Sequence, residues 1–288
     1  ASTLLTPSQT PLHTEGRYIV DRNGKRVKWA CVAWYGSESK TLVANGLEVQ
    51  SMQSIVDRIL QLGFNCVRLP YSIEGQIGNP VVEQRFLAAN PEFYGQHWQK
   101  IFDATVHALT SAGLMVIIDQ HVSKAGWCCF AAQPEGLWYQ EGYPEEMWMQ
   151  SLENMTARYQ SNALVVAIEL RNEVHDCGGV SVHWGSGDSR SDWHAAAMRA
   201  ATRVQKVNPD VLIVVEALCF GMELRGLQRH QVSLPISGRI VFAVHNYLEF
   251  NVWALIDQHV CSWNVVRILC GCCLVVIAGV SVYLFVSW

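Results

Sequence analysis

Several common signatures are missing from this 288-residue chain, and each absence excludes a class of protein. Only 16% of the residues are charged, the net charge is -4, and no long block of Lys and Arg occurs, so the basic footprint of a nucleic-acid-binding protein is absent. The ten cysteines do not form the two CxxC pairs of a zinc site, and no GxGxxG or GxxxxGK[ST] turn follows the first predicted strand. We therefore expect no metal, no other cofactor and no nucleic-acid partner.

The composition is apolar and rich in aromatic residues, with few charged ones. Half of the residues are hydrophobic, which suits one globular domain with a sizeable core. Eleven Trp and nine Tyr are many for this length, and aromatic faces stack on the apolar faces of sugar rings, although most Trp side chains simply fill cores. The composition permits a carbohydrate partner without proving one.

Short apolar runs alternate with amphipathic segments. An Asn-Gly turn predicts a hairpin within Arg17–Trp29. Runs rich in Val and Ile predict strands at Lys28–Tyr35, Asn65–Tyr71, Leu114–His121, Ala163–Glu173, Val211–Glu216 and Arg239–Tyr247. Helices are predicted at Val49–Leu62, His97–Ala112, Pro144–Tyr159 and Ser191–Val207. Because parallel strands need crossover connections, this order predicts an α/β barrel or a doubly wound sheet, and the missing nucleotide-binding turn favours the barrel.

Polar and aromatic side chains collect at the carboxyl ends of the predicted strands, where the active site of a barrel lies. The strongest signal is the pair Asn172-Glu173 at the end of an apolar strand. Glycoside cleavage needs a carboxylic acid to protonate the leaving oxygen, a second carboxylate, and a hydrogen bond to the sugar 2-hydroxyl. Glu173 suits the acid and Asn172 the hydrogen-bond donor, and we expect Glu173 to be partly buried.

Motifs in a fixed order make the chain resemble glycoside hydrolase family 5, the cellulase family, and its eukaryotic members in particular. The resemblance runs from about Leu12 to Tyr247, through GFNCVRLPYS at 63–72, DQH at 119–121, GWCC at 126–129, GLWY at 136–139, NE at 172–173 and HNY at 245–247. It implies a TIM-type (β/α)8 barrel and a retaining hydrolase that cleaves a β-linked polysaccharide such as cellulose or β-glucan.

The resemblance also implies roles for single residues. Glu173 is the general acid/base and Arg68 orients the nucleophile. The matching positions that shape the sugar subsite or attend the reaction centre are His121, Asn172, His245 and Tyr247. We add Trp34 and Trp138 as candidates for sugar stacking, with core packing as the equal alternative, and Glu216 as a candidate supporting residue.

One expected residue is not found. Family members carry a nucleophilic Glu on the seventh strand, in a Glu-Phe-Gly-like motif, whereas the only carboxylates after Tyr247 are Glu249 and Asp257, outside any such motif. We therefore expect an incomplete barrel of about six strand units in which Arg68 faces an empty position that Glu216 is best placed to fill. The alternative is a catalytically inactive, membrane-anchored, carbohydrate-binding pseudo-hydrolase.

The end of the sequence differs in character. We assign 1–250 to the barrel domain and 251–288 to a divergent tail. The uncharged apolar run 268–288 in this tail is long enough for a transmembrane helix. The alternatives are a buried helix and a gene-model artefact. The sequon at Asn154 and the loop cysteines Cys128, Cys129 and Cys177 agree with a secreted or membrane-anchored location. Cys31 and Cys66, inside strands, are expected to be buried free thiols, and the protein to be a monomer.

Overall fold

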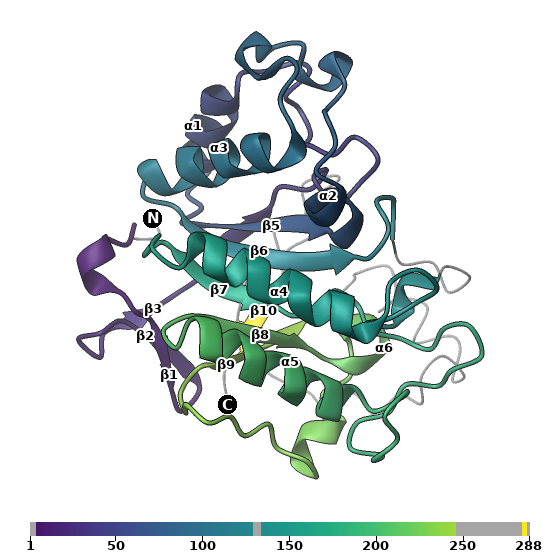
Figure 1. Cartoon of the computed structure of the whole chain (residues 1–288). Coiled ribbons are helices and arrows are strands. Elements are labelled where there is room, and N and C mark those ends of the chain that lie inside the picture. The colour runs from purple at the N-terminus through teal and green to yellow at the C-terminus, as the bar shows by residue number, and fades with distance from the viewer. Residues whose placement is uncertain (1–3, 129–133, 246–283, 287–288) are drawn as a thin grey trace, which may run out of the picture.

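The main sheet of the computed structural model, which describes residues 4–128, 134–245 and 284–286, is a curled sheet with strand order β10-β9-β8-β7-β6-β5-β4 (Figure 1). Neighbours from β4 to β9 are parallel. These six strands are β4 (Cys31–Ala33), β5 (Cys66–Ser72), β6 (Met115–Val122), β7 (Val165–Glu169), β8 (Leu212–Glu216) and β9 (Ile240–Val244). All six predicted strands are present, with ends that differ by a few residues.

Helices cover the outer face of this sheet (Figure 1). The predicted ones are confirmed as α1 (Met52–Gln61), α3 (Trp98–Ser111), α4 (Glu145–Tyr159) and α5 (Trp193–Val207), with the short α2 (Ile73–Gly78) and α6 (Leu218–Gly221) in addition. Gly63 and Gly113 follow α1 and α3 with φ values of 86° and 83°, the left-handed conformation that favours glycine at a helix end. The Ser51 side chain accepts the backbone N–H of Ser54 and caps the start of α1.

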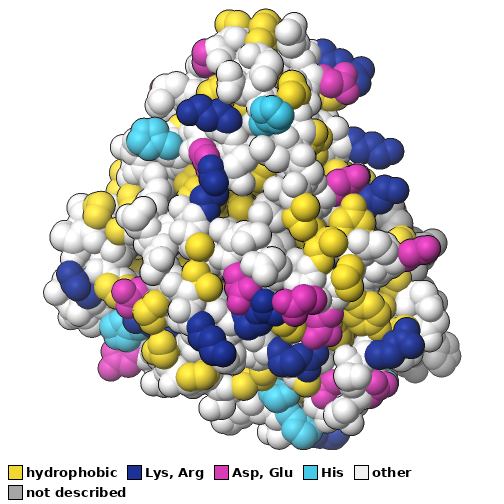
Figure 2. All heavy atoms as spheres, viewed as in Figure 1, with side chains coloured by type: hydrophobic (Ala, Val, Ile, Leu, Met, Phe, Trp, Pro, Cys, Tyr) yellow, Lys and Arg dark blue, Asp and Glu magenta, His cyan; other side chains and the backbone are white. Residues whose placement is uncertain are grey.

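Ion pairs between α4 and α5 dominate one face of the molecule. Arg203 of α5 pairs with Glu146 at 2.7 Å and Glu153 at 2.6 Å, and Arg199 pairs with Glu145 at 2.6 Å. Figure 2 shows basic and acidic side chains interleaved across this face rather than gathered by sign. The face therefore offers no basic patch to a nucleic acid.

The amino-terminal segment closes one end of the curled sheet. Strands β1 (His13–Glu15), β2 (Tyr18–Val20) and β3 (Arg26–Val27) form a separate antiparallel sheet beside the amino ends of the main strands (Figure 1). Leu12 and Ile19 pack into the same buried cluster as Met115 and Leu212, the first residues of β6 and β8. The predicted hairpin is confirmed, and it covers the apolar floor of the barrel.

Side-chain alternation then builds a polar layer above this floor. Ile117 and Val214 belong to the inner apolar cluster, and two residues further along the same strands lie Asp119 and Glu216. Because successive side chains in a strand point to opposite faces, residues two apart share the inner face. The buried polar layer formed by this two-residue step consists of Arg68, Asp119, Glu169, Glu216 and His245.

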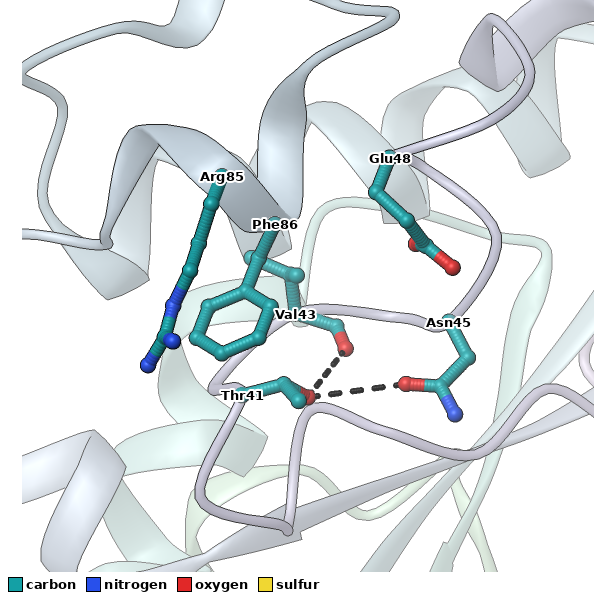
Figure 3. A pocket seen from close by; sticks show the side chains of 6 residues that line it. All are labelled: Thr41, Val43, Asn45, Glu48, Arg85 and Phe86. Atoms are coloured by element: carbon teal, nitrogen blue, oxygen red, sulfur yellow. Dashed lines mark hydrogen bonds between the residues drawn. The ribbon is translucent and has the colours of Figure 1, made fainter.

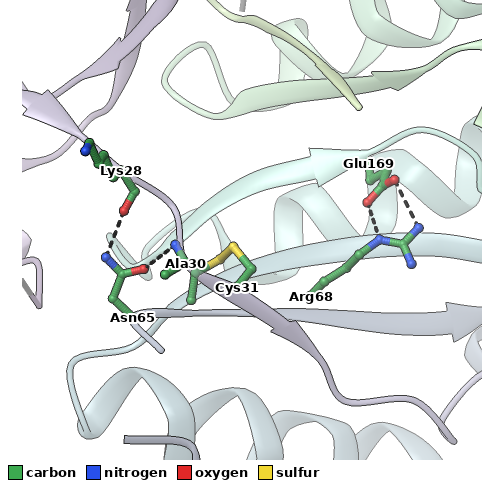
Figure 4. The surroundings of a disulfide bond; sticks show 7 residues. Lys28, Ala30, Cys31, Asn65, Arg68 and Glu169 are labelled. Carbon is green, nitrogen blue, oxygen red and sulfur yellow. Dashed lines mark hydrogen bonds and ion pairs between the residues drawn. A yellow bond between two sulfur atoms is a disulfide. The ribbon is translucent and has the colours of Figure 1, made fainter. Parts of the chain in front are cut away.

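The prediction that Cys31 and Cys66 are free thiols is wrong, because they form a disulfide (Figure 4). The two residues are register partners on the parallel strands β4 and β5, and both belong to the inner apolar cluster. Sequence alone does not give the register of two strands, so it could not show this pairing. Cys128 and Cys219 are disulfide-bonded as well, and Cys177 is buried.

The predicted tail falls largely outside the described residues. Of the apolar run 268–288, only β10 (Leu284–Val286) is described, and it is a strand antiparallel to β9 rather than part of a helix. The edge of β9 offers unpaired backbone groups, which an added strand satisfies. None of the helices within the described ranges is long and apolar enough to cross a membrane. The domain boundary at 250 and 251 stays a prediction.

Asn65 tests how the start of β4 is joined to the start of β5. Its side chain accepts the Ala30 N–H at 2.8 Å and donates to the Lys28 carbonyl at 2.9 Å (Figure 4). We expect Asn65→Ala to lower the free energy of unfolding by about 1–3 kcal/mol, because the buried amide of Asn65 is lost and the two backbone groups that it bridges lose their partner. Chemical denaturation measures this, with the exposed Asn154→Ala as the control, expected to change stability by less than about 0.5 kcal/mol. Equal effects from both variants would contradict the bridging role.

Candidate active site

The polar layer and the residues that follow β7 bring most of the predicted site residues together. Arg68, Glu216 and His245 lie within the layer, and Asn172 and Glu173 contact it. Tyr247 lies outside the described residues. The sheet thus gathers side chains that are up to 177 positions apart in sequence, from Arg68 to His245.

Arg68 occupies the centre of the layer and is almost fully buried. Its Nε and Nη2 lie 2.7 and 3.0 Å from the two carboxylate oxygens of Glu169 (Figure 4), the bidentate geometry that gives strong ion pairs. Nη2 also lies 3.0 Å from Asp119 Oδ2, 3.2 Å from Glu216 Oε1 and 2.9 Å from Asn172 Oδ1. Arg68 therefore does not face an empty position: Glu216 contacts it, as expected, and Glu169 and Asp119 contact it as well.

Glu173 lies just beyond β7 in an unusual backbone conformation. Its φ is 50°, in the left-handed region that residues other than glycine rarely adopt. Its backbone N–H donates to Glu216 Oε2 at 2.6 Å, and its Oε1 accepts a hydrogen bond from His245 Nδ1 at 2.8 Å. The side chain is buried, more completely than the partial burial expected, and contacts on both its backbone and its carboxylate fix its orientation.

His245 lies between two carboxylates. Nδ1 contacts Glu173 Oε1 at 2.8 Å, and Nε2 lies 3.0 Å from Glu216 Oε1. Burial alone would lower the pKa of His245, but the charges of Glu216 and Glu173 prevail and raise it to about 10. Burial likewise acts to raise the pKa of Glu216, and the His245 charge outweighs it and lowers that pKa to about 2. The pair is therefore an imidazolium and a carboxylate at neutral pH.

The pKa of Glu169 shifts in the opposite direction from that of Glu216. Complete burial raises the pKa of Glu169 well above its ordinary value, with the Arg68 charge acting against this shift and the charges of Asp119 and Glu216 adding to it. The bidentate contact with Arg68 is the interaction that favours the charged form of Glu169 within the layer.

Arg171, between the layer and the surface loops, fixes the approach to Asn172 and Glu173. Its Nη2 donates to the carbonyl of Glu135 at 2.9 Å and lies 2.8 Å from Glu135 Oε2, while Nη1 donates to Gln120 Oε1 at 3.1 Å. Glu135 in turn accepts backbone N–H groups of the loop that follows β6. This buried pair ties the end of β7 to that loop.

His121 and Asn172 meet at a disulfide-bonded cysteine. Nδ1 of His121 lies 2.6 Å from Asp119 Oδ2, and its Nε2 lies 3.4 Å from Cys128 Sγ. Nδ2 of Asn172 lies 3.5 Å from the same sulfur atom. His121 thus belongs to the site through Asp119, as a partly buried residue at its edge.

A family model, cellulase (glycosyl hydrolase family 5), matches residues 20–265. The chain belongs to glycosyl hydrolase family 5. It is 30% identical over 246 residues to an endoglucanase of Paenibacillus polymyxa, covering 82% of this chain and 59% of that one. It is 34% identical over 254 residues to a glycosyl hydrolase 5 family protein of Chamaecyparis obtusa, covering 82% and 44%. The chain thus spans about half the length of these curated relatives.

A solved structure supports the same fold for this family 5 chain. The endocellulase of Pyrococcus horikoshii in complex with cellotetraose superposes with a TM-score of 0.71 at 24% identity, over 83% of this chain and 69% of that one. The predicted family and the predicted barrel architecture are confirmed, with six parallel strands of the barrel described here.

The two tryptophans predicted to stack on sugar belong to the core of this family 5 domain. Trp138 is fully buried, and Trp34 is 6% exposed with its indole N–H donating to the Asn45 carbonyl. Neither presents a ring face to a ligand, so both take the core-packing alternative. The exposed aromatic pair lies in the loops after β4 and β6, where the rings of Tyr35 and Trp127 meet edge to face, 6.3 Å apart.

A cavity of about 290 Å³ lies away from the polar layer (Figure 3). It is formed by the loop before α1 and the turn η2 (Gln84–Leu87), and its lining residues are Thr41, Val43, Asn45, Glu48, Arg85 and Phe86. None of them contacts Glu173 or the layer, so the cavity does not bear on family 5 chemistry.

The geometry of the polar layer would also allow a metal ion to bind. One ligand atom from each of Glu169, Glu216 and His245 lies within 4.8 Å of the others. The imidazole is protonated at neutral pH, however, and Arg68 already pairs with both carboxylates. A metal would have to displace that proton and compete with the guanidinium, so we assign these carboxylates to Arg68.

Sequence reasoning missed Glu169 and Asp119 as partners of Arg68. Both lie inside runs identified as apolar strands. Asp119 precedes His121 by two positions, and Glu169 precedes Glu173 by four. The two-residue spacing of Asp119 from Ile117, and of Glu169 from Ala167, is the signal that could have placed both carboxylates on the inner face of the sheet, although not their pairing with Arg68.

Glu216→Gln tests the charge relation within the layer. We expect the pKa of His245 to fall from about 10 toward or below its ordinary 6.5, because the amide removes a charge that stabilises the imidazolium while burial persists. NMR titration of the imidazole protons measures this, with Glu153→Gln on α4 as the control. An unchanged His245 titration would contradict the assignment.

The same shifts predict how stability depends on pH. The folded pKa of His245 is raised, so its stabilising contribution is complete below about 6.5 and is lost as the pH rises through about 10. The folded pKa of Glu216 is depressed, so its contribution is present above about 4.5 and is lost as the pH falls through about 2. In the alkaline window we expect the free energy of unfolding to fall by roughly 1.4 kcal/mol per pH unit, measured by denaturation, and Glu216→Gln to flatten this slope.

Proposed function

We propose that this family 5 domain is built to cleave β-linked glucan with Glu173 as its general acid/base, and that the 288-residue chain turns over only very slowly because the described residues offer no nucleophile. The observation that carries the proposal is the way Glu173 is held at the carboxyl end of β7, with its carboxylate on His245 and its backbone on Glu216. Family membership supports the reaction class, and a relative named an endoglucanase supports the substrate class. The cellotetraose bound by the Pyrococcus horikoshii endocellulase is a β-linked glucan oligosaccharide of the kind proposed here.

The second carboxylate of a retaining mechanism does not come from the polar layer. A nucleophile must reach the anomeric carbon, and the two carboxyl groups stand about 5–5.5 Å apart across the bond. Asp119, Glu169 and Glu216 are completely buried and each contacts Arg68. We therefore propose that Glu216 is a positioning residue, which agrees with the supporting role suggested for it from the sequence. The remaining carboxylates after Tyr247, Glu249 and Asp257, lie outside the described residues.

A non-catalytic carbohydrate-binding protein is the second candidate. The complete burial of the layer carboxylates favours it, because Glu173 is then the sole layer-contacting carboxylate in the described ranges that is not fully enclosed. Both candidates share the carboxyl-end face and differ only in bond cleavage.

We also propose a secretory route. The disulfide of Cys31 with Cys66, and the disulfide-bonded state of Cys128 and Cys219, support an oxidising compartment. Attachment to a membrane and a monomeric state stay predictions.

The test combines Glu173→Gln with a chimera in which residues 246–288 are replaced by the corresponding segment of the Paenibacillus polymyxa endoglucanase. We expect the 288-residue chain to bind cellotetraose weakly and to release reducing ends very slowly, and the chimera to turn over. In the chimera, Glu173→Gln should lower kcat/KM by about 10²–10⁴-fold, the usual contribution of a general acid. Release of reducing ends from cellotetraose is the measurement, and Glu153→Gln is the control.

Each other outcome has a defined meaning. A chimera that binds cellotetraose without turnover would favour the binding protein. Full activity after Glu173→Gln would remove the acid/base role. Rapid turnover by the 288-residue chain itself would indicate that it supplies its own nucleophile, which Glu249→Gln and Asp257→Asn would then identify.

A further inference from the structure

We propose that His175 is a positioning residue for Glu173, whose imidazole holds the backbone of the acid/base in the left-handed conformation that aims its carboxylate. The proposal rests on the proposed function for its chemical meaning. Its structural part, the control of the Glu173 backbone by His175, stands on contacts alone.

The backbone of Glu173 needs such a hold. A non-glycine residue at φ 50° is strained, and this conformation persists only where the surroundings impose it. The peptide N–H of Glu173 is held by Glu216 Oε2 at 2.6 Å. Its carbonyl oxygen is contacted by His175 Nδ1. The two groups that flank the strained torsions of Glu173 are thus both fixed by side chains.

The hydrogen on His175 can be assigned from this contact. A carbonyl oxygen only accepts, so Nδ1 of His175 carries the hydrogen and donates it to Glu173. Nε2 is buried and has no hydrogen-bond partner among the described residues. Burial, reinforced by the nearby charge of Arg171, lowers the pKa of His175 despite the opposing contact with Glu173. The ring is therefore neutral, with its single hydrogen directed at the acid/base.

The imidazole is itself held rigidly. It stacks on the Phe220 ring with centroids 3.8 Å apart and planes 18° from parallel, and it is 2% exposed. Its backbone N–H donates to the Gly136 carbonyl at 2.9 Å. A side chain at Gly136 would meet His175 Cδ2 at 2.8 Å, so only glycine leaves room for the ring. Since the ring does not shift easily, its contact with Glu173 constrains the backbone.

The function of this hold follows from the other end of Glu173. The carboxylate meets His245 Nδ1 at 2.8 Å, and a rotation of the Glu173 backbone toward negative φ would swing the carboxylate away from that partner. Among the described residues, His175 contacts neither Arg68 nor any other member of the polar layer, so it acts through Glu173.

Two substitutions separate the donor from the ring. In His175→Asn the amide nitrogen stands where Nδ1 stood, so the hydrogen bond is kept and the stack on Phe220 is lost. In His175→Phe the stack is kept and the donor is lost. Both should lower thermal stability to a similar degree, and the exposed His107→Phe on α3 serves as the control.

Crystal structures of the full 288-residue variants give the first readout. We expect Glu173 to keep its positive φ and its contact with His245 in His175→Asn, and to lose both in His175→Phe. A positive φ and an intact contact in His175→Phe would overturn the proposal, and so would their loss in His175→Asn alone. This arm does not depend on turnover.

Leaving-group dependence gives the second readout. An acid matters most when the leaving group is a poor one, so His175→Phe placed in the chimera should lower kcat/KM at least tenfold on cellotetraose and less than threefold on 2,4-dinitrophenyl β-cellobioside. His175→Asn in the chimera should stay within threefold of the unsubstituted chimera on both. Equal losses on both substrates that track thermal stability would mean that His175 is only structural. Absence of turnover by the unsubstituted chimera on either substrate would count against the proposed function and leave the crystallographic arm to decide.

Discussion

The burial of the Arg68 guanidinium is the constraint on which the rest of the site depends. A buried cation is costly unless it is paired, and removing one partner of a buried pair typically costs about 3–5 kcal/mol. Arg68 comes from β5, and its partners Asp119, Glu169 and Glu216 come from β6, β7 and β8. One side chain thus draws the carboxyl ends of four neighbouring strands together. His245 adds a second cation from the end of β9, which extends the same balance of charge to a fifth strand.

Charge balance separates the supporting carboxylates from Glu173, the proposed acid/base. The carboxylates that pair with Arg68 are completely buried, whereas Glu173 is 7% exposed and is bound by His245. Glu216 joins the two groups, since one of its oxygens meets Arg68 and His245 and the other accepts the Glu173 N–H. The rigid interior of the barrel is therefore coupled to Glu173 through one carboxylate. This explains how a residue in a strained backbone conformation keeps a defined position.

The sequence predicts this fold well where the signal is local. Apolar runs located all six parallel strands, and Gly63 and Gly113 located two helix ends, because periodicity and left-handed glycines act over a few residues. Contacts set by register were not predictable: the Cys31–Cys66 disulfide and the Glu169–Arg68 pair depend on which positions face each other across the sheet. The burial of Trp138 was not predictable either, because an aromatic residue in a loop is equally consistent with core packing and with ligand contact.

Stability and catalysis draw on different parts of this site. The sequence suggested Glu216 as the carboxylate that takes the position beside Arg68, and the structure gives the cation Asp119 and Glu169 in addition, all from neighbouring strands. The polar layer is consequently satisfied whether or not a further carboxylate approaches Glu173. Since an unpaired buried cation would otherwise destabilise the fold, this self-sufficiency lets the part of the site that carries Glu173 persist as a folded unit. The position of Glu173 then depends on Glu216 and His245, which both belong to that layer.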